Sequence, residues 1–367
     1  MPKAEIDRTI RHLVLILAMS ILLGLTKTTA TAQSVPPLPS KPSLTAAERV
    51  EVVRSAAGQI EQNYVFENKA KQIAAQLRGS VAQAAANAPE DPKAFAEWLT
   101  GELRRIGSDK RLELTAPSTS SSPIASQTRA QRLGWLDRLR RRNYDFIRVE
   151  RLAGNVGYLS LNSFPPPEVA QETAAAAMAF LKHSDALIID LRANGGGTGD
   201  MVRLLASYFF AEPTRLSRSF RRYGVPQVSY DSTLTTIPGE RMPIIDLFIL
   251  TSGETFSAAE AFAFALQQRN RAQTVGEKTG GGGNAGDYLD VAYGFSVFVP
   301  DVAVSSPISD ESWEGVGVKP NIPVTSIQAL EVAHRTAVRR LLVAATDPTT
   351  RQRYQQVLEE IASSPAN

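Results

Sequence analysis

Residues 186–201, ALIIDLRANGGGTGDM, contain the turn on which the fold prediction rests. The apolar run at 186–191 is typical of a strand buried in a parallel sheet, and the glycines Gly195, Gly196 and Gly197 lead into a helical pattern. A glycine turn between a strand and a helix lets backbone N–H groups converge on a negative charge. No Lys-Ser or Lys-Thr pair follows it, as a P-loop requires, and the third glycine of the dinucleotide fingerprint is missing. An oxyanion hole and a simple tight turn remain as alternatives.

Strand and helix patterns alternate on both sides of this turn. We expect strands at 156–161, 186–191 and 244–250, and helices at 168–181, 200–210 and 258–269. Further strand patterns follow at 273–275, 288–292 and 295–299. This order predicts an α/β (α+β) fold with a mainly parallel sheet flanked by helices. In such a sheet, sites form beyond the carboxyl ends of the strands.

A second segment, 247–266 or LFILTSGETFSAAEAFAFAL, places a serine beyond another strand end. Ser257 stands where a helix pattern begins, and Glu260 follows three residues later. One interpretation is a capping box, in which Ser257 only caps the helix. The other is a nucleophile whose oxyanion is stabilised by the Ala258 N–H and the helix dipole. The segment alone leaves both interpretations open and favours the cap.

The N-terminal residues have the pattern of an exported protein. A basic start, an apolar run at 13–25 and Ala30-Thr31-Ala32 predict a cleaved secretory signal at 1–32, with an uncleaved anchor as the alternative. An extended proline-rich tether at 33–44 leads into a helical N-terminal domain at 45–114. A linker with an amphipathic helix follows at 115–145, then an α/β core at 146–326 and a helical hairpin at 327–367. We expect a bacterial periplasmic or secreted protein without a membrane segment after cleavage.

The composition excludes several classes of protein. The chain has no cysteine and three histidines, so disulfide scaffolds, thiolate metal sites and imidazole-rich metal sites are not expected. Forty Lys and Arg against 37 Asp and Glu give a formal charge of +3, which does not indicate a nucleic-acid partner. We expect neither a metal nor a cofactor, and the sequence does not define an oligomeric state.

Four motifs in a fixed order resemble one peptidase family. The motifs are DLRANGGG, TFSAAEAFAFAL, VGEKTGGG and WEGVGVKPNIPV. In this order they resemble motifs of the carboxyl-terminal-processing and tricorn-core serine peptidases, in the branch resembling interphotoreceptor retinoid-binding protein. The resemblance implies a crotonase-like core of the tail-specific-protease type at 146–326, a small helical N-terminal domain, and a peptide or protein substrate. It implies a serine-type peptidase without metal or cofactor.

The resemblance also implies roles for individual residues. Ser257 matches the nucleophile, and the N–H groups of Ala258 and Gly196 match the oxyanion donors. The neighbouring glycines expected at the substrate are Gly195, Gly197 and Gly281. One solution for the general base is a Lys twenty-five residues after the serine, and Gly282 stands there instead.

The other solution uses a His from the N-terminal domain and a carboxylate that matches Glu314. The related motif reads Asp-Lys-His-Leu, whereas residues 109–112 read Asp-Lys-Arg-Leu, so Arg111 stands at the His position. Arginine cannot act as a base near neutrality. A His that relatives often carry after the glycine run is replaced by Asn284. We expect Arg111 to project toward Ser257 and to pair with Glu314, the alternative being a side chain that points to solvent.

Other base candidates are weaker. His183 precedes a strand, and we expect it at the opposite end of the sheet from Ser257; His334 falls in the C-terminal hairpin, and Lys278 would need burial to lower its pKa. Two hypotheses follow from the sequence. The chain is either an exported serine peptidase weakened by Arg111, or a catalytically impaired relative that binds a peptide or an apolar ligand.

Overall fold

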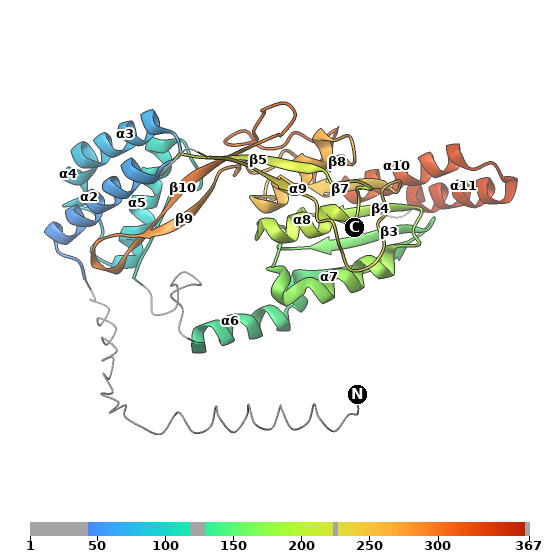
Figure 1. Cartoon of the computed structure of the whole chain (residues 1–367), viewed down its shortest axis with the longest axis horizontal. Coiled ribbons are helices and arrows are strands. Elements are labelled where there is room, and N and C mark those ends of the chain that lie inside the picture. The colour runs from blue at the N-terminus through green and yellow to red at the C-terminus, as the bar shows by residue number, and fades with distance from the viewer. Residues whose placement is uncertain (1–42, 118–128, 223–226, 364–367) are drawn as a thin grey trace, which may run out of the picture. The chain divides into compact units, whose positions relative to one another are not determined.

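A computed structural model describes residues 43–117, 129–222 and 227–363 (Figure 1). The predicted signal at 1–32 and nearly all of the predicted tether at 33–44 lie outside the described residues. Within the described ranges, no helix is long and apolar enough to cross a membrane.

The central sheet has six strands in the order β11-β8-β7-β4-β3-β2. All neighbours pair in parallel except β2, which pairs with β3 in antiparallel. From one edge to the other, the strands are Ile322–Pro323, Gln273–Gly276, Asp246–Thr251, Ala186–Asp190, Val156–Leu161 and Phe146–Leu152. The predicted mainly parallel sheet is therefore present, with β2 as an additional edge strand.

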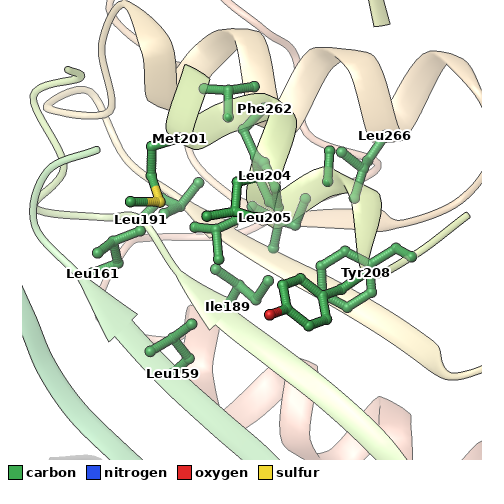
Figure 2. Close-up of a cluster of buried hydrophobic side chains, with 14 of the residues drawn as sticks. Leu159, Leu161, Ile189, Leu191, Met201, Leu204, Leu205, Tyr208, Phe262 and Leu266 are labelled. Carbon is green, nitrogen blue, oxygen red and sulfur yellow. The ribbon is translucent and has the colours of Figure 1, made fainter. Parts of the chain in front are cut away.

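Helices cover both faces of this sheet. Successive side chains of a strand point to opposite faces, so Ile189 and Ile249 pack on one side while Ile188 and Leu250 pack on the other. The first face is covered by α7, α8 and α9, at Pro167–Leu181, Gly199–Ser207 and Ala258–Gln268. Figure 2 shows the contact between strand residues such as Ile189 and helix residues such as Leu205. The other face is covered by α10 and α11, at Ala329–Ala344 and Pro348–Ser363.

A second sheet is antiparallel and departs from the sequence prediction. Its path is β1-β10-β5-β6, with β9 also paired to β10. These strands are Glu113–Thr115, Ser296–Ser305, Arg215–Arg221, Gln227–Ser232 and Ala285–Asp290. The strand patterns at 288–292 and 295–299 thus belong to a hairpin, not to the parallel sheet. A connection this short, with the 3₁₀ turn η3 at Ala292–Gly294, cannot provide the crossover that parallel pairing needs.

The N-terminal helices pack on this second sheet (Figure 1). They are α2 to α5, at Ala46–Asn63, Glu67–Gln76, Ala82–Ala85 and Pro92–Gly107, with a π-helical turn η1 at Leu77–Val81. Thr45 and Glu48 form a capping box at the start of α2, and Asp91 caps α5 through the Ala94 N–H. Phe95 of α5 meets Phe295 edge to face at 5.9 Å.

Helix α6 and the 3₁₀ turn η2 lie between strands β1 and β2 in the sequence. Helix α6 spans Arg129–Arg141, where the sequence predicts an amphipathic helix, and a 3₁₀ turn η2 follows at Asn143–Asp145. Arg111 lies between α5 and β1, and β1 pairs with β10 from Glu113 to Thr115. This pairing fixes the segment that carries Arg111 against the second sheet.

Candidate active site

The glycine turn and the serine lie beyond the carboxyl ends of two adjacent strands. In the register of β4 and β7, Asp190 is opposite Leu250, so the chain after each strand emerges at the same edge. Hydrogen bonds connect the two turns: Ser252 Oγ donates to the Arg192 carbonyl at 2.6 Å, and the Phe256 N–H donates to the Asn194 carbonyl at 3.0 Å. The two turns therefore lie side by side at this edge of the sheet.

Ser257 occupies a strained position before helix α9. Its φ is 55° and its ψ is −119°, and a positive φ at a residue other than glycine costs about 1–3 kcal/mol. Its N–H donates to Glu260 Oε2 at 2.9 Å, while its Oγ accepts a hydrogen bond from Arg111 Nη1 at 3.0 Å. Glu260 therefore makes its contact of the expected capping box, and the Ser257 hydroxyl in addition faces Arg111.

Gly196 lies against Ser257. Its φ is +113°, and a Cβ at this position would lie 2.7 Å from the Ser257 Cβ, so the close approach requires glycine. Its N–H, however, donates to Asn194 Oδ1 at 2.9 Å. In this arrangement the expected oxyanion donor therefore has an acceptor within its own turn. The Ala258 N–H, at the first turn of α9, has no acceptor among the described residues.

The three glycines expected at the substrate differ in their surroundings. Gly197 lines the cavity beside Ser257, whereas Gly195 and Gly281 are not among its lining residues. Gly281 is buried, and its N–H donates to Glu260 Oε1 at 2.6 Å. The contact with Glu260 helps to shape the loop that carries Gly281.

Glu260 organises the loop that faces Ser257. Its carboxylate is completely buried. Besides the Ser257 N–H, it accepts hydrogen bonds from the Thr279 hydroxyl at 2.5 Å and from the N–H groups of Gly281 and Gly282 at 2.6 and 2.7 Å. The sequence shows Glu260 as a capping residue but carries no signal for the three partners from the loop.

Glu314 is held by the same loop. Its Oε2 accepts hydrogen bonds from the N–H groups of Gly283 and Asn284, both at 2.7 Å. Burial raises the pKa of the Glu314 carboxyl, against the opposing influence of the Asn284 N–H. The glycine run thus contacts two carboxylates, those of Glu260 and Glu314.

Arg111 stands at the position where the resemblance places a base. Its Nη1 also donates to the Gly282 carbonyl at 3.3 Å, and its guanidinium lies 5.0 Å from the centre of the Phe298 ring and 5.8 Å from that of Phe256. Burial lowers the pKa of Arg111, while Glu314 and Asp109 act in the opposite direction. The expected projection toward Ser257 is observed.

The expected ion pair between Arg111 and Glu314 is not observed. In the part of the chain that the structure describes, no carboxylate oxygen lies within 4.0 Å of an Arg111 nitrogen. The physical reason is that the accepting oxygen of Glu314 already has two backbone donors, while the guanidinium is directed at Ser257 Oγ. This part of the sequence expectation is wrong.

The other base candidates lie away from Ser257. His334 Nε2 is 2.8 Å from the carbonyl of Ala153, in the turn between β2 and β3, and burial lowers its pKa. His183 precedes β4, at the end of the sheet opposite Ser257. Lys278 is exposed and so lacks the burial that would make it a base. Among the described residues, no group of His, Asp and Glu side chains could hold a metal ion.

A cavity of about 180 Å³ adjoins Ser257. Its walls come from the glycine turn, α9, the second sheet and the loop of Glu314. Its lining residues include apolar Val202, Leu216, Ala265, Val302 and Trp313, together with polar or charged Arg203, Ser217, Ser219 and Asp231. Arg111 and Asn284 line the same cavity. The space can receive a side chain of a ligand whose backbone passes Ser257.

Two family models match this chain. Residues 155–324 match peptidase family S41, and residues 44–137 match the model described as the N-terminal domain of this family in eukaryotic IRBP. The chain belongs to peptidase family S41. The first match contains Ser257 and Glu314, and the second contains Arg111. The family resemblance inferred from the sequence is confirmed.

Two carboxyl-terminal-processing proteases match part of the chain. A carboxy-terminal-processing protease of Bartonella bacilliformis is 28% identical over 188 residues, which are 49% of this chain and 42% of that protein. A carboxyl-terminal-processing protease of Synechocystis sp. is 30% identical over 153 residues, 42% of this chain and 34% of that protein. The chain therefore spans less than half the length of these relatives.

Solved structures match over more of the chain. A crystal structure from Parabacteroides merdae, described as that of a peptidase, has a TM-score of 0.53 and 19% identity and covers 77% of this chain and 91% of that one. The structure of a lipoprotein from Streptococcus agalactiae has a TM-score of 0.50 and 16% identity, and the match covers 83% of this chain and 98% of that one. At such identities the likeness concerns the fold alone. The predicted α/β fold with a helical N-terminal region is confirmed.

Proposed function

We propose that this S41 protein is a serine-type peptidase with Ser257 as nucleophile and with hydrolysis slowed by Arg111. The observation that carries the proposal is the 3.0 Å hydrogen bond from Arg111 Nη1 to Ser257 Oγ. A cationic donor stands where the reaction needs an acceptor for the serine proton, and arginine stays protonated in proteins. Peptide or protein chains are the proposed substrates.

The remaining groups fit acyl transfer. Ser257 Oγ would attack the peptide carbonyl, and the Ala258 N–H would bind the oxyanion that forms. Gly196 could become a second donor if its peptide turned away from Asn194 Oδ1. Glu314 would orient whichever group accepts the proton, with no metal or cofactor taking part.

The expected rate follows from the missing base. Removal of one triad member from a serine peptidase lowers turnover by on the order of 10⁴ to 10⁶, while the oxyanion site and binding leave roughly 10³ to 10⁴ over water. We therefore expect hydrolysis that is measurable over hours and far slower than that of an ordinary peptidase.

Hydrolysis of casein and of short fluorogenic peptides tests the proposal. Wild type should cleave slowly, and Ser257→Ala should abolish the cleavage because the nucleophile is lost. Cleavage that persists in Ser257→Ala would assign the activity to another group. Complete absence of cleavage in wild type would favour the second candidate, a protein that binds peptides without turnover; the cavity of about 180 Å³ beside Ser257 supports that candidate.

We further propose that the protein is exported to the periplasm or secreted. The basic start, the apolar run and the Ala30-Thr31-Ala32 site support this localisation. N-terminal sequencing of the exported protein should give a first residue of Gln33. A chain that still begins at Met1 would contradict cleavage.

A further inference from the structure

Strand β2 is a free edge of the central sheet. It pairs with β3 on one side, and residues 147–152 make no backbone hydrogen bond to any other strand that the structure describes. The strand is also accessible, because Ile147 is 55% exposed and the side chains of Arg148 and Arg151 are exposed. A row of unpaired N–H and C=O groups at an accessible edge is a template for a strand from another chain.

A groove of about 480 Å³ lies beside this edge, on the face of the sheet that α7 covers. Its lining is mostly apolar and includes Val149 of β2 and Ala176 and Phe180 of α7. Phe180 is 60% exposed, so the groove presents a large apolar side chain to solvent. An exposed apolar groove next to an unpaired edge is typical of a surface that another chain covers.

The charges along β2 are complementary to a second copy of the same strand. Residues 148–151 read Arg-Val-Glu-Arg. If two copies of β2 pair antiparallel about Val149, Arg148 of each copy lies directly opposite Glu150 of the other, on the same face. The two residues form an ion pair within one chain, but 57% of the Arg148 side chain stays exposed and its guanidinium has further donors. Opposite charges directly across a strand pair stabilise the pairing.

The α7 face of the same pairing is complementary as well. Arg151 of one copy lies opposite position 147 of the other, near the end of the groove that Glu172 lines. Neither Arg151 nor Glu172 has an ion-pair partner among the described residues. Strand β6, another exposed edge, carries Asp231 as its one charge, so two copies of β6 offer each other no such pairs.

We propose that two copies of the chain form a dimer through their β2 strands, which pair antiparallel about a two-fold axis at Val149. The two central sheets then continue into one another, and the β2 side chains of each copy cover the groove of the other. Each contact occurs twice because the interface is symmetric. Since the paired segment is short, we expect a dissociation constant of about 1–100 µM. No residue of β2 lines the cavity beside Ser257, so the dimer does not depend on the proposed peptidase function.

Sedimentation velocity on the purified protein tests the association directly. Between about 1 and 200 µM, the wild-type protein should change from monomer to dimer. Arg148→Glu and Glu150→Arg should each weaken the dimer at least about tenfold, because each turns two attractive cross-strand pairs into repulsive ones. The double exchange Arg148→Glu/Glu150→Arg restores opposite charges and should bring the dimer back.

Arg105→Glu is the matched control for these charge exchanges. Arg105 is an exposed arginine of α5 that likewise has a carboxylate partner, Glu102, but it lies outside β2 and α7. The same change of charge there should leave the dissociation constant unchanged. Far-UV circular dichroism of each variant shows whether it is folded.

A cysteine at the two-fold axis tests the register of the strands. The chain has no cysteine, so Val149→Cys supplies one thiol per copy. Directly opposite Cα atoms of an antiparallel pair are about 4.5–5.5 Å apart, which a disulfide can span. Mild oxidation should therefore link Val149→Cys into a covalent dimer. Val228→Cys, on the exposed strand β6, is the control and should link far more slowly. This test stays decisive if a charge variant does not fold.

Three results would overturn the proposal: a monomer at about 200 µM, a dimer that tolerates both single charge exchanges, or cross-linking of Val149→Cys no faster than that of Val228→Cys. A monomer at every concentration would assign the β2 edge to an extended segment of a different protein. The proposed function fails on different evidence, namely hydrolysis that does not depend on Ser257, and neither failure implies the other.

Discussion

Arg111 Nη1 donates a hydrogen bond to Ser257 Oγ across 3.0 Å, although the two residues are 146 positions apart in the chain. One comes from the N-terminal helical region and the other from the turn after β7. A general base at this distance could accept the serine proton, since the geometry is that of a nucleophile and its base. The arrangement is therefore suited to catalysis, but the residue type is not.

Arg111→His should increase hydrolysis. An imidazole at this position could accept the serine proton, and general-base catalysis contributes about 10²- to 10⁴-fold. The measurement is kcat/KM on a fluorogenic peptide, with the double variant Arg111→His/Ser257→Ala as control. A gain that remains in the double variant, or no gain at all, would contradict the assignment of position 111.

Gly282→Lys should not restore activity, even though the lysine solution of the family uses this position. A Cβ on Gly282 would overlap the ring of Phe256, and the Gly282 N–H binds Glu260.

Gly282→Ala should lower the free energy of unfolding by about 1–3 kcal/mol through the same overlap. Gly58→Ala is the control, because a Cβ there meets no atom within 4 Å. Urea unfolding compares the two, and equal stabilities would refute the overlap.

Glu260→Gln should destabilise the loop that faces Ser257. The carboxylate accepts four hydrogen bonds, and an amide would direct its NH₂ group at donors, which should cost at least about 2 kcal/mol. Chemical denaturation measures the effect. The exposed Glu254→Gln is the matched control and should change stability by less than about 0.5 kcal/mol. A neutral Glu260→Gln would show that the loop does not depend on this carboxylate.

His334 should make the protein less stable at acid pH. Burial lowers its pKa below the ordinary value of 6.5, so the unfolded chain binds the proton more readily than the folded one. The stabilisation is complete above pH 6.5 and decreases as the pH falls toward the folded-state pKa, by at most about 1.4 kcal/mol per pH unit. His334→Gln should flatten this part of the stability profile. An unchanged profile would exclude His334 as the cause.

Much of the fold could be predicted from the sequence because its strands are apolar and its turns rich in glycine. The segments that form β4 and β7 have continuous apolar patterns. The motifs that follow them place Gly196 and Ser257 beyond neighbouring strand ends. Strand β6, QVSYDS, was missed because five of its six residues are exposed and it has no buried face. Its pairing with β5 depends on tertiary context, not on periodicity.

The site was less predictable because backbone groups decide its details. Glu314 binds two loop N–H groups, so it does not pair with Arg111, and no sequence pattern reports such donors. The contact between the Gly196 N–H and Asn194 Oδ1 could have been anticipated. An asparagine commonly bonds to the backbone two residues later, and Asn194 stands two residues before Gly196.

Labelling of Ser257 by a fluorophosphonate probe tests most directly whether the serine lacks a base. Such a probe reacts with activated serines, so wild type should be labelled slowly, at least about 10²-fold more slowly than Arg111→His, with no labelling of Ser257→Ala. Trypsin provides the reference rate under the same conditions. Wild-type labelling as fast as that of trypsin, and lost in Ser257→Ala, would show that Ser257 is activated by a group other than residue 111 and would contradict the account.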